Sequence, residues 1–213
     1  MPGIDLAQLF IAFSVLLFSI TVHGWAQVWM ADRLGDGTAR RHGRLSLDPV
    51  VHADLVGTLC CPAVAWLSGL PLLGWGQRVL VDGTAFPRPR RDTLLVAATG
   101  PASHLGLAVA AAALLALVPV APVRLGEPNV SAPIAALLSR GVQLNLMLAV
   151  FTSLPIPPLD GGLALSALLP RGLSGALDRV RPHGALLLGM LIVTRVLTPV
   201  VMPPYNLLRA WFL

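Results

Sequence analysis

Residues 18–36 of the chain read FSITVHGWAQVWMADRLGD. The first half of this stretch closes a long apolar run that begins near Ile4, and His23 lies inside that run. An ionisable side chain within a segment long enough to cross a membrane is a candidate for a functional site. Residues four positions apart share one face of a helix, so His23 and Gln27 are expected to point the same way.

The spacing of His23 and Gln27 matches the zinc-binding helix motif His-Glu-x-x-His. In that motif the two histidines bind the metal and the glutamate acts as the general base. This chain has His-Gly-Trp-Ala-Gln at residues 23–27, with Gly24 in the glutamate position and Gln27 in that of the second histidine. The spacing is present, whereas the base and one ligand are absent.

The composition indicates an integral membrane protein. Hydrophobic residues make up 55% of the 213 residues and charged residues only 12%, whereas soluble domains average about a quarter charged residues. The net charge of +5 comes from arginine alone. No aromatic, basic module accompanies these arginines, so they are interpreted as orientation signals and no nucleic-acid partner is expected. Cys60 and Cys61 are adjacent and form neither a disulfide framework nor a CxxC site.

The apolar runs predict an all-α polytopic membrane protein with four to five transmembrane helices, in a single membrane-embedded domain over residues 1–213. About 20 apolar residues cross a bilayer. The first run is too long for a signal peptide and is expected to remain as a helix. The predicted spans are residues 4–31, 93–121, 141–154 continuing through the turn PIPPLDGG into 163–169, and 184–201, which contains Arg195. Residues 122–140 are expected to form a loop. A small β-hairpin is considered at residues 77–81, turning at Asp82–Gly83.

Residues 52–73 are apolar but are interrupted by Pro62, Gly69 and Pro71, and they allow either a full crossing or a re-entrant hairpin. A hairpin places both arginine-rich loops on one side. Eight arginines then share that side, at positions 33, 40, 41, 44, 78, 88, 90 and 91. A full crossing divides them four and four. The rule that arginines accumulate in cytoplasmic loops favours the hairpin.

The hairpin also brings polar residues together. His23 then lies toward the inner end of its helix, His104 in the first turns of the next span, and Asp160 just past the inner end of the following one. A full crossing would place His104 in the opposite leaflet.

Three stretches, in this order, resemble the site-2 protease family of intramembrane zinc metalloproteases in its short bacterial form. The first is residues 18–36 with their continuation TARRHGRLSLDPVVHADLVGT at 38–58. The second is Gly-Pro-Ala-Ser-His at 100–104, which is similar to the family's Gly-Pro-x-x-Asn. The third is LPIPPLDGG at 154–162, which is similar to its proline-rich approach to a metal-binding aspartate. The resemblance covers residues 10–165 and leaves residues 184–213 as an additional C-terminal helix and tail.

The resemblance implies roles only where residues match. His23 corresponds to the first zinc-binding histidine and Asp160 to the metal-binding aspartate, and His104 replaces the motif asparagine and is a third candidate metal ligand. Gln27 and Thr152 stand at positions where substrate binding is considered. No catalytic residue is assigned, because the position of the family's glutamate holds Gly24.

Two functions follow from this comparison. The leading hypothesis is a catalytically inactive pseudoprotease of the bacterial inner membrane that binds or regulates the transmembrane segment of another protein. The alternative is an active metalloprotease in which zinc is held by His23, His104 and Asp160. Under the first hypothesis these residues form a buried polar cluster, because polar groups inside a membrane need hydrogen-bonding partners. The lipid bilayer is the expected surroundings, and the sequence does not define an oligomeric state.

Overall fold

The structure is a computed structural model, and it describes residues 6–67, 69, 72–119 and 131–212. Within these residues the regular structure is helical and no strand forms, as expected for an all-α membrane protein. The helices are α1 Leu6–Arg33, α2 Thr38–Arg41, α3 Pro49–His52, the π-helix η1 Leu55–Cys60, α4 Cys61–Leu67, α5 Pro89–Ala116, α6 Ser131–Thr152, α7 Asp160–Leu168, α8 Arg171–Val180, the 3-10 helix η2 Arg181–His183, α9 Gly184–Val193 and α10 Thr198–Phe212.

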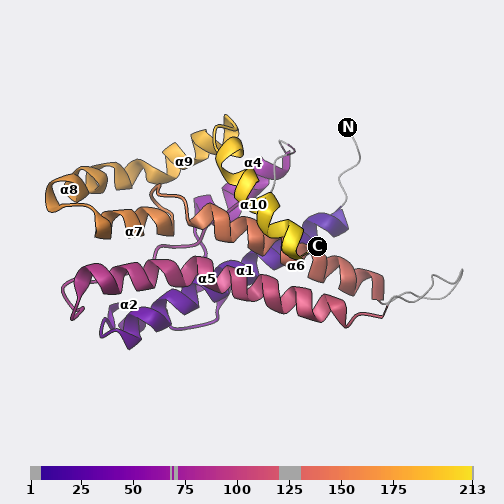
Figure 1. Cartoon of the computed structure of the whole chain (residues 1–213), viewed down its shortest axis with the longest axis horizontal. Coiled ribbons are helices and arrows are strands. Elements are labelled where there is room, and N and C mark those ends of the chain that lie inside the picture. The colour runs from indigo at the N-terminus through magenta and orange to yellow at the C-terminus, as the bar shows by residue number, and fades with distance from the viewer. Residues whose placement is uncertain (1–5, 68, 70–71, 120–130, 213) are drawn as a thin grey trace, which may run out of the picture.

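Three helices, α1, α5 and α6, are long and apolar enough to cross a membrane. The shortest, α6, has 22 residues, and a rise of 1.5 Å per residue makes it about 33 Å long. Helix α5 packs against α1, α6 and α7, and in Figure 1 it runs below α6 and α7. The expected loop at 122–140 is wrong from Ser131 onward, because α6 begins there. Arg140 lies on its exposed face, where a long side chain can reach the membrane surface.

The apolar segment after His52 does not cross the bundle. Leu55–Leu67 is a short apolar helix, about 20 Å long at 1.5 Å per residue. The chain then returns, since Trp75 N donates to Gly57 O (3.2 Å) and Gly76 forms an isolated bridge with Ala53. The two ends of the segment are therefore adjacent, as in a re-entrant hairpin.

The β-hairpin considered at residues 77–81 does not form. Side chains hold this extended segment in place of a second strand: Arg44 donates to Arg78 O (2.8 Å) and to Gln77 Oε1 (2.6 Å). Asp36 Oδ2 accepts from Asp82 N (2.7 Å). The segment is thus fixed to the arginine-rich loop without pairing on itself.

The last span is bent, in contrast to the straight helix expected at residues 184–201. Helices α9 and α10 meet at 78°, so the described residues contain three spans, or four if this pair is one broken span. Arg195 lies at the break with a φ of 59° and is exposed on the surface of the bundle. Pro199 follows the first residue of α10, a position where proline favours the start of a helix. Arg195 is therefore a residue of the break and lies outside both helices.

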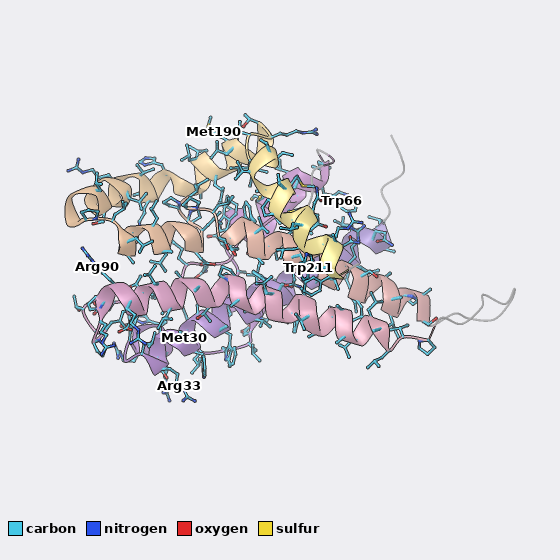
Figure 2. The ribbon with its side chains drawn as sticks, in the orientation of Figure 1. Met30, Arg33, Trp66, Arg90, Met190 and Trp211 are labelled. Carbon is cyan, nitrogen blue, oxygen red and sulfur yellow. The ribbon has the colours of Figure 1, made fainter. Side chains whose placement is uncertain are left out.

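Both arginine-rich loops lie at one end of the bundle, and Figure 2 shows Arg33 and Arg90 at that end. We predict that both loops are cytoplasmic. In a background without Cys60 and Cys61, cysteines introduced as Arg40→Cys and Arg88→Cys should both be protected from an impermeant thiol reagent in intact cells and should react after permeabilisation. Labelling of Arg88→Cys alone in intact cells would contradict the hairpin.

Candidate functional site

His23 is the centre of a set of polar side chains within the bundle. From α1, its Nδ1 lies 3.0 Å from His104 Nε2 on α5, and its Nε2 lies 3.2 Å from Asp160 Oδ2 at the start of α7. The side chains of His23 and Asp160 are only 13% and 12% exposed. The structure therefore brings together the three residues that were considered as metal ligands.

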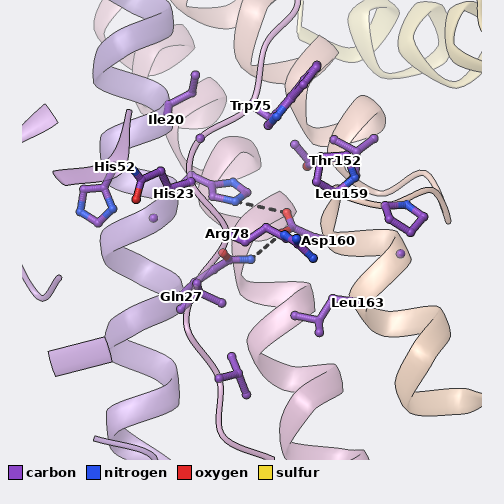
Figure 3. A pocket seen from close by; sticks show the side chains of 18 of the residues that line it. Ile20, His23, Gln27, His52, Trp75, Arg78, Thr152, Leu159, Asp160 and Leu163 are labelled. Atoms are coloured by element: carbon purple, nitrogen blue, oxygen red, sulfur yellow. Dashed lines mark hydrogen bonds and ion pairs between the residues drawn. The ribbon is translucent and has the colours of Figure 1, made fainter. Parts of the chain in front are cut away.

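Gln27 binds the same carboxylate one helical turn further along α1. Its Nε2 donates to Asp160 Oδ1 (2.7 Å), as Figure 3 shows beside the His23 contact. The i, i+4 spacing thus places two α1 side chains on one carboxylate. The Gln27 side chain is thus hydrogen-bonded to Asp160, and the substrate contact considered for it stays a prediction.

Asn145 on α6 completes the set, and sequence reasoning missed it. Its Oδ1 lies 3.0 Å from His104 Nδ1, and its Nδ2 donates to Gly141 O (2.9 Å). His104 is 1% exposed and Asn145 is 3% exposed. The sequence feature that could have indicated it is a lone asparagine in the apolar run of α6, because buried polar groups in membranes need partners. We refer to His23, Gln27, His104, Asn145 and Asp160 as the polar cluster.

The hydrogen-bond partners define which nitrogen of each histidine in the polar cluster carries a proton. Because Asn145 Nδ2 donates to Gly141 O, its Oδ1 accepts from His104 Nδ1. The other nitrogen of a neutral His104 then accepts from His23 Nδ1. His23 Nε2 consequently faces Asp160 Oδ2, and this contact is favourable only when one of the two atoms carries a proton.

This arrangement does not match a three-ligand zinc site. A catalytic zinc has three protein ligands whose lone pairs point at one metal. His104 Nε2 points at His23 Nδ1, whereas Asp160 lies at the opposite nitrogen of the same ring. Across the part of the chain that the structure describes, no group of three or more His, Cys, Asp or Glu residues is arranged to hold a metal ion.

His52 fills the space beside Gly24, where the zinc motif has its glutamate. A Cβ at Gly24 would overlap His52 Nδ1 and lie 2.9 Å from His52 Cγ. The ring is 3% exposed, and its Nε2 bonds to Ser46 O (2.7 Å). Burial lowers the pKa of His52, with a further lowering by Arg44, against a smaller opposing effect of the Ser46 carbonyl. The neutral ring therefore donates from Nε2 and presents the lone pair of Nδ1 to Gly24.

Gly100 on α5 is in close contact with three side chains of the polar cluster. A Cβ there would lie 2.8 Å from Gln27 Nε2 and closer still to His23 Cε1 and Asp160 Oδ2. Pro101 follows inside α5. The absence of a side chain at position 100 is thus what allows α1 and α7 to meet over α5.

A cavity of about 320 Å³ opens beside the polar cluster. Its walls are the His23 face of α1, the extended segment 74–81, the proline turn at 157–159 and the start of α7 (Figure 3). Thr152 also lines it, is 4% exposed, and its hydroxyl has no hydrogen-bond partner among the described residues. We refer to this space as the polar cavity.

The fold and the site define the class of protein: a helical, polytopic membrane protein with a histidine–carboxylate cluster and a cavity between its helices. The chain is 32% identical over 191 residues to the protein named "Putative zinc metalloprotease YwhC" of Bacillus subtilis (strain 168), across 90% of this chain and 84% of that protein. The chain therefore belongs to the same zinc-metalloprotease-like family. No protein-family model and no solved structure matches it.

Proposed function

We propose that the chain is a site-2-protease-like pseudoprotease of the bacterial cell membrane, which binds a membrane segment of another protein without cleaving it. The observation that carries this proposal is the pair Gly24 and His52. The position of the general base has no side chain, and a buried ring fills the space that a side chain would need. General acid–base catalysis contributes about 10²–10⁴-fold to a rate, and position 24 supplies none of it.

The polar cluster supports the same proposal. His104 and Asp160 bind opposite nitrogens of His23, so the ligand set of the alternative, active enzyme is engaged in hydrogen bonds and an ion pair. The relative's name makes zinc the metal to test. What remains is an apolar bundle with a partly polar cavity, which suits binding of a chain segment that has left the lipid.

The first test is metal content and cleavage. We expect the detergent-purified protein to contain far less than one zinc per chain by elemental analysis and to leave reconstituted transmembrane substrates intact. An active site-2 protease under identical conditions is the positive control. About one zinc per chain, lost in His23→Ala and His104→Ala, together with chelator-sensitive cleavage, would establish the active enzyme instead.

Binding is tested separately with a photocross-linking amino acid at Leu163, which lines the polar cavity. We expect it to cross-link to transmembrane peptides in nanodiscs. The matched control is Val109 on α5, which is 54% exposed and is not a cavity residue. Equal cross-linking from both positions would show only lipid-phase collision and would contradict binding in the cavity.

A further inference from the structure

The charges that line the polar cavity are mostly positive. Arg78 and Arg181 lie in its wall, and Asp160 is its only lining carboxylate among the described residues. Asp160 is already bound by Gln27 and His23. Among the described residues, the side chains that line the cavity therefore carry more positive than negative charge.

Arg78 has a fixed backbone, and its guanidinium has no ion-pair partner among the residues that the structure describes. Its carbonyl accepts from Arg44 (2.8 Å), which attaches this part of the extended segment to the arginine-rich loop. Arg78 takes part in neither the His23–Asp160 nor the Arg40–Asp32 ion pair. Its side chain is exposed and extends toward the cavity in Figure 3. The guanidinium is thus available for an anion at a defined place.

Thr152 adds an independent observation deeper in the cavity. It is 4% exposed and its hydroxyl has no partner within the described part of the chain. A buried hydroxyl without a partner is costly, so a group that accepts its hydrogen bond is favoured there. The Arg78 guanidinium can only donate hydrogen bonds and the Thr152 hydroxyl can donate one, which suits an anionic ligand rich in acceptor oxygens.

We propose that the polar cavity binds a phosphate group, and that its source is the headgroup of an anionic phospholipid. Guanidinium binds phosphate oxygens through paired, charge-assisted hydrogen bonds. Basic pockets between membrane helices are typical sites for anionic headgroups. The cavity lies between membrane helices and has about 320 Å³ of space. The proposal of a lipid site does not require that a membrane segment also binds in this cavity.

The test compares lipids in native mass spectrometry of the detergent-solubilised full chain. Phosphatidylglycerol should remain bound at concentrations where phosphatidylcholine does not, and Arg78→Gln should weaken its binding about tenfold, the effect of losing a hydrogen bond to a charged group. Arg91→Gln is the matched control, since Arg91 is exposed on α5 and does not line the cavity. Arg181→Gln, at the other arginine that lines the cavity, is a second variant that should also weaken binding.

The outcomes separate the possible sources of the anion. Loss of binding in Arg78→Gln but not in Arg91→Gln supports the headgroup site. Equal binding of both lipids, or equal loss in both variants, would overturn it. Displacement of the lipid by inorganic phosphate at comparable concentration would assign the site to a soluble phosphate compound. Arg78-dependent binding of an acidic peptide without lipid binding would likewise exclude the lipid.

Discussion

Gly24→Ala is expected to destabilise the protein strongly, and His52→Ala to relieve most of that loss. The added methyl group would occupy the position of His52 Nδ1, and the ring is held by its bond to Ser46 O (2.7 Å). Forcing an additional group into a packed core costs about 1–3 kcal/mol. Thermal melts in detergent should therefore show a drop of several degrees in the melting temperature.

The measurement is a double-mutant cycle on Gly24→Ala, His52→Ala and the double variant. Side chains in contact should give a non-additive result: the double variant should lose less stability than the two single variants lose together. Strictly additive effects would show that position 24 and His52 do not interact, which would contradict the packing argument. Gly189→Ala is the matched control, because Gly189 lies in α9 with no neighbour within 4 Å of its Cβ position.

The same contact affects any attempt to restore a protease motif. Gly24→Glu/Gln27→His supplies the missing base and ligand, but the glutamate would meet both the His52 ring and the lone pair of its Nδ1. We expect this double variant to be unstable, and the triple variant with His52→Ala to fold and to gain zinc by elemental analysis. A double variant as stable as the wild type would contradict the packing argument.

Gly100→Ala is expected to disrupt the polar cluster. Its methyl group would meet side chains of His23, Gln27 and Asp160 at once, so the Asp160 contacts of α1 must separate or α5 must shift. The loss combines overpacking of about 1–3 kcal/mol with weakened buried hydrogen bonds of about 1–3 kcal/mol each.

Gly106→Ala provides the comparison on the same helix. Apart from its own turn of the helix, no described atom lies within 4 Å of its Cβ position. This variant should therefore be neutral or stabilised, since alanine is favoured over glycine in a helix by up to about 1 kcal/mol. Melting temperatures of the two variants in one detergent give the result. Equal melting temperatures would show that α5 does not press against the polar cluster.

The membrane helices could be predicted because their signal is local. Apolar runs of sufficient length mark α1 and α5, and the arginine count favoured the re-entrant hairpin at residues 52–73. The bend at Arg195 was missed, because hydropathy does not register a break within an apolar run. The β-hairpin was wrong because the partners of the extended segment, Arg44 and Asp36, lie far from it in the sequence.

The candidate site was predicted in location but not in arrangement. The motif spacing and the hairpin topology brought His23, His104 and Asp160 to one place, where the structure has them. The direction of each ring nitrogen depends on packing between helices, which one sequence does not encode in any local pattern. For the same reason the packing of His52 on Gly24 could not be read from residues 28 positions apart.

The packing of His52 on Gly24 also has a consequence for sequence evolution. Natural proteins have only a small margin of stability, so a loss of one or two kcal/mol lowers the amount of folded protein in a cell. A lineage that acquired glutamate at position 24 before changing residue 52 would pass through such a protein, and it would still have glutamine at position 27. Selection for proteolysis cannot act on that intermediate. Residue 52 therefore has to change before residue 24 can. Descendants of this chain are expected to keep glycine at position 24 for as long as they keep histidine at position 52.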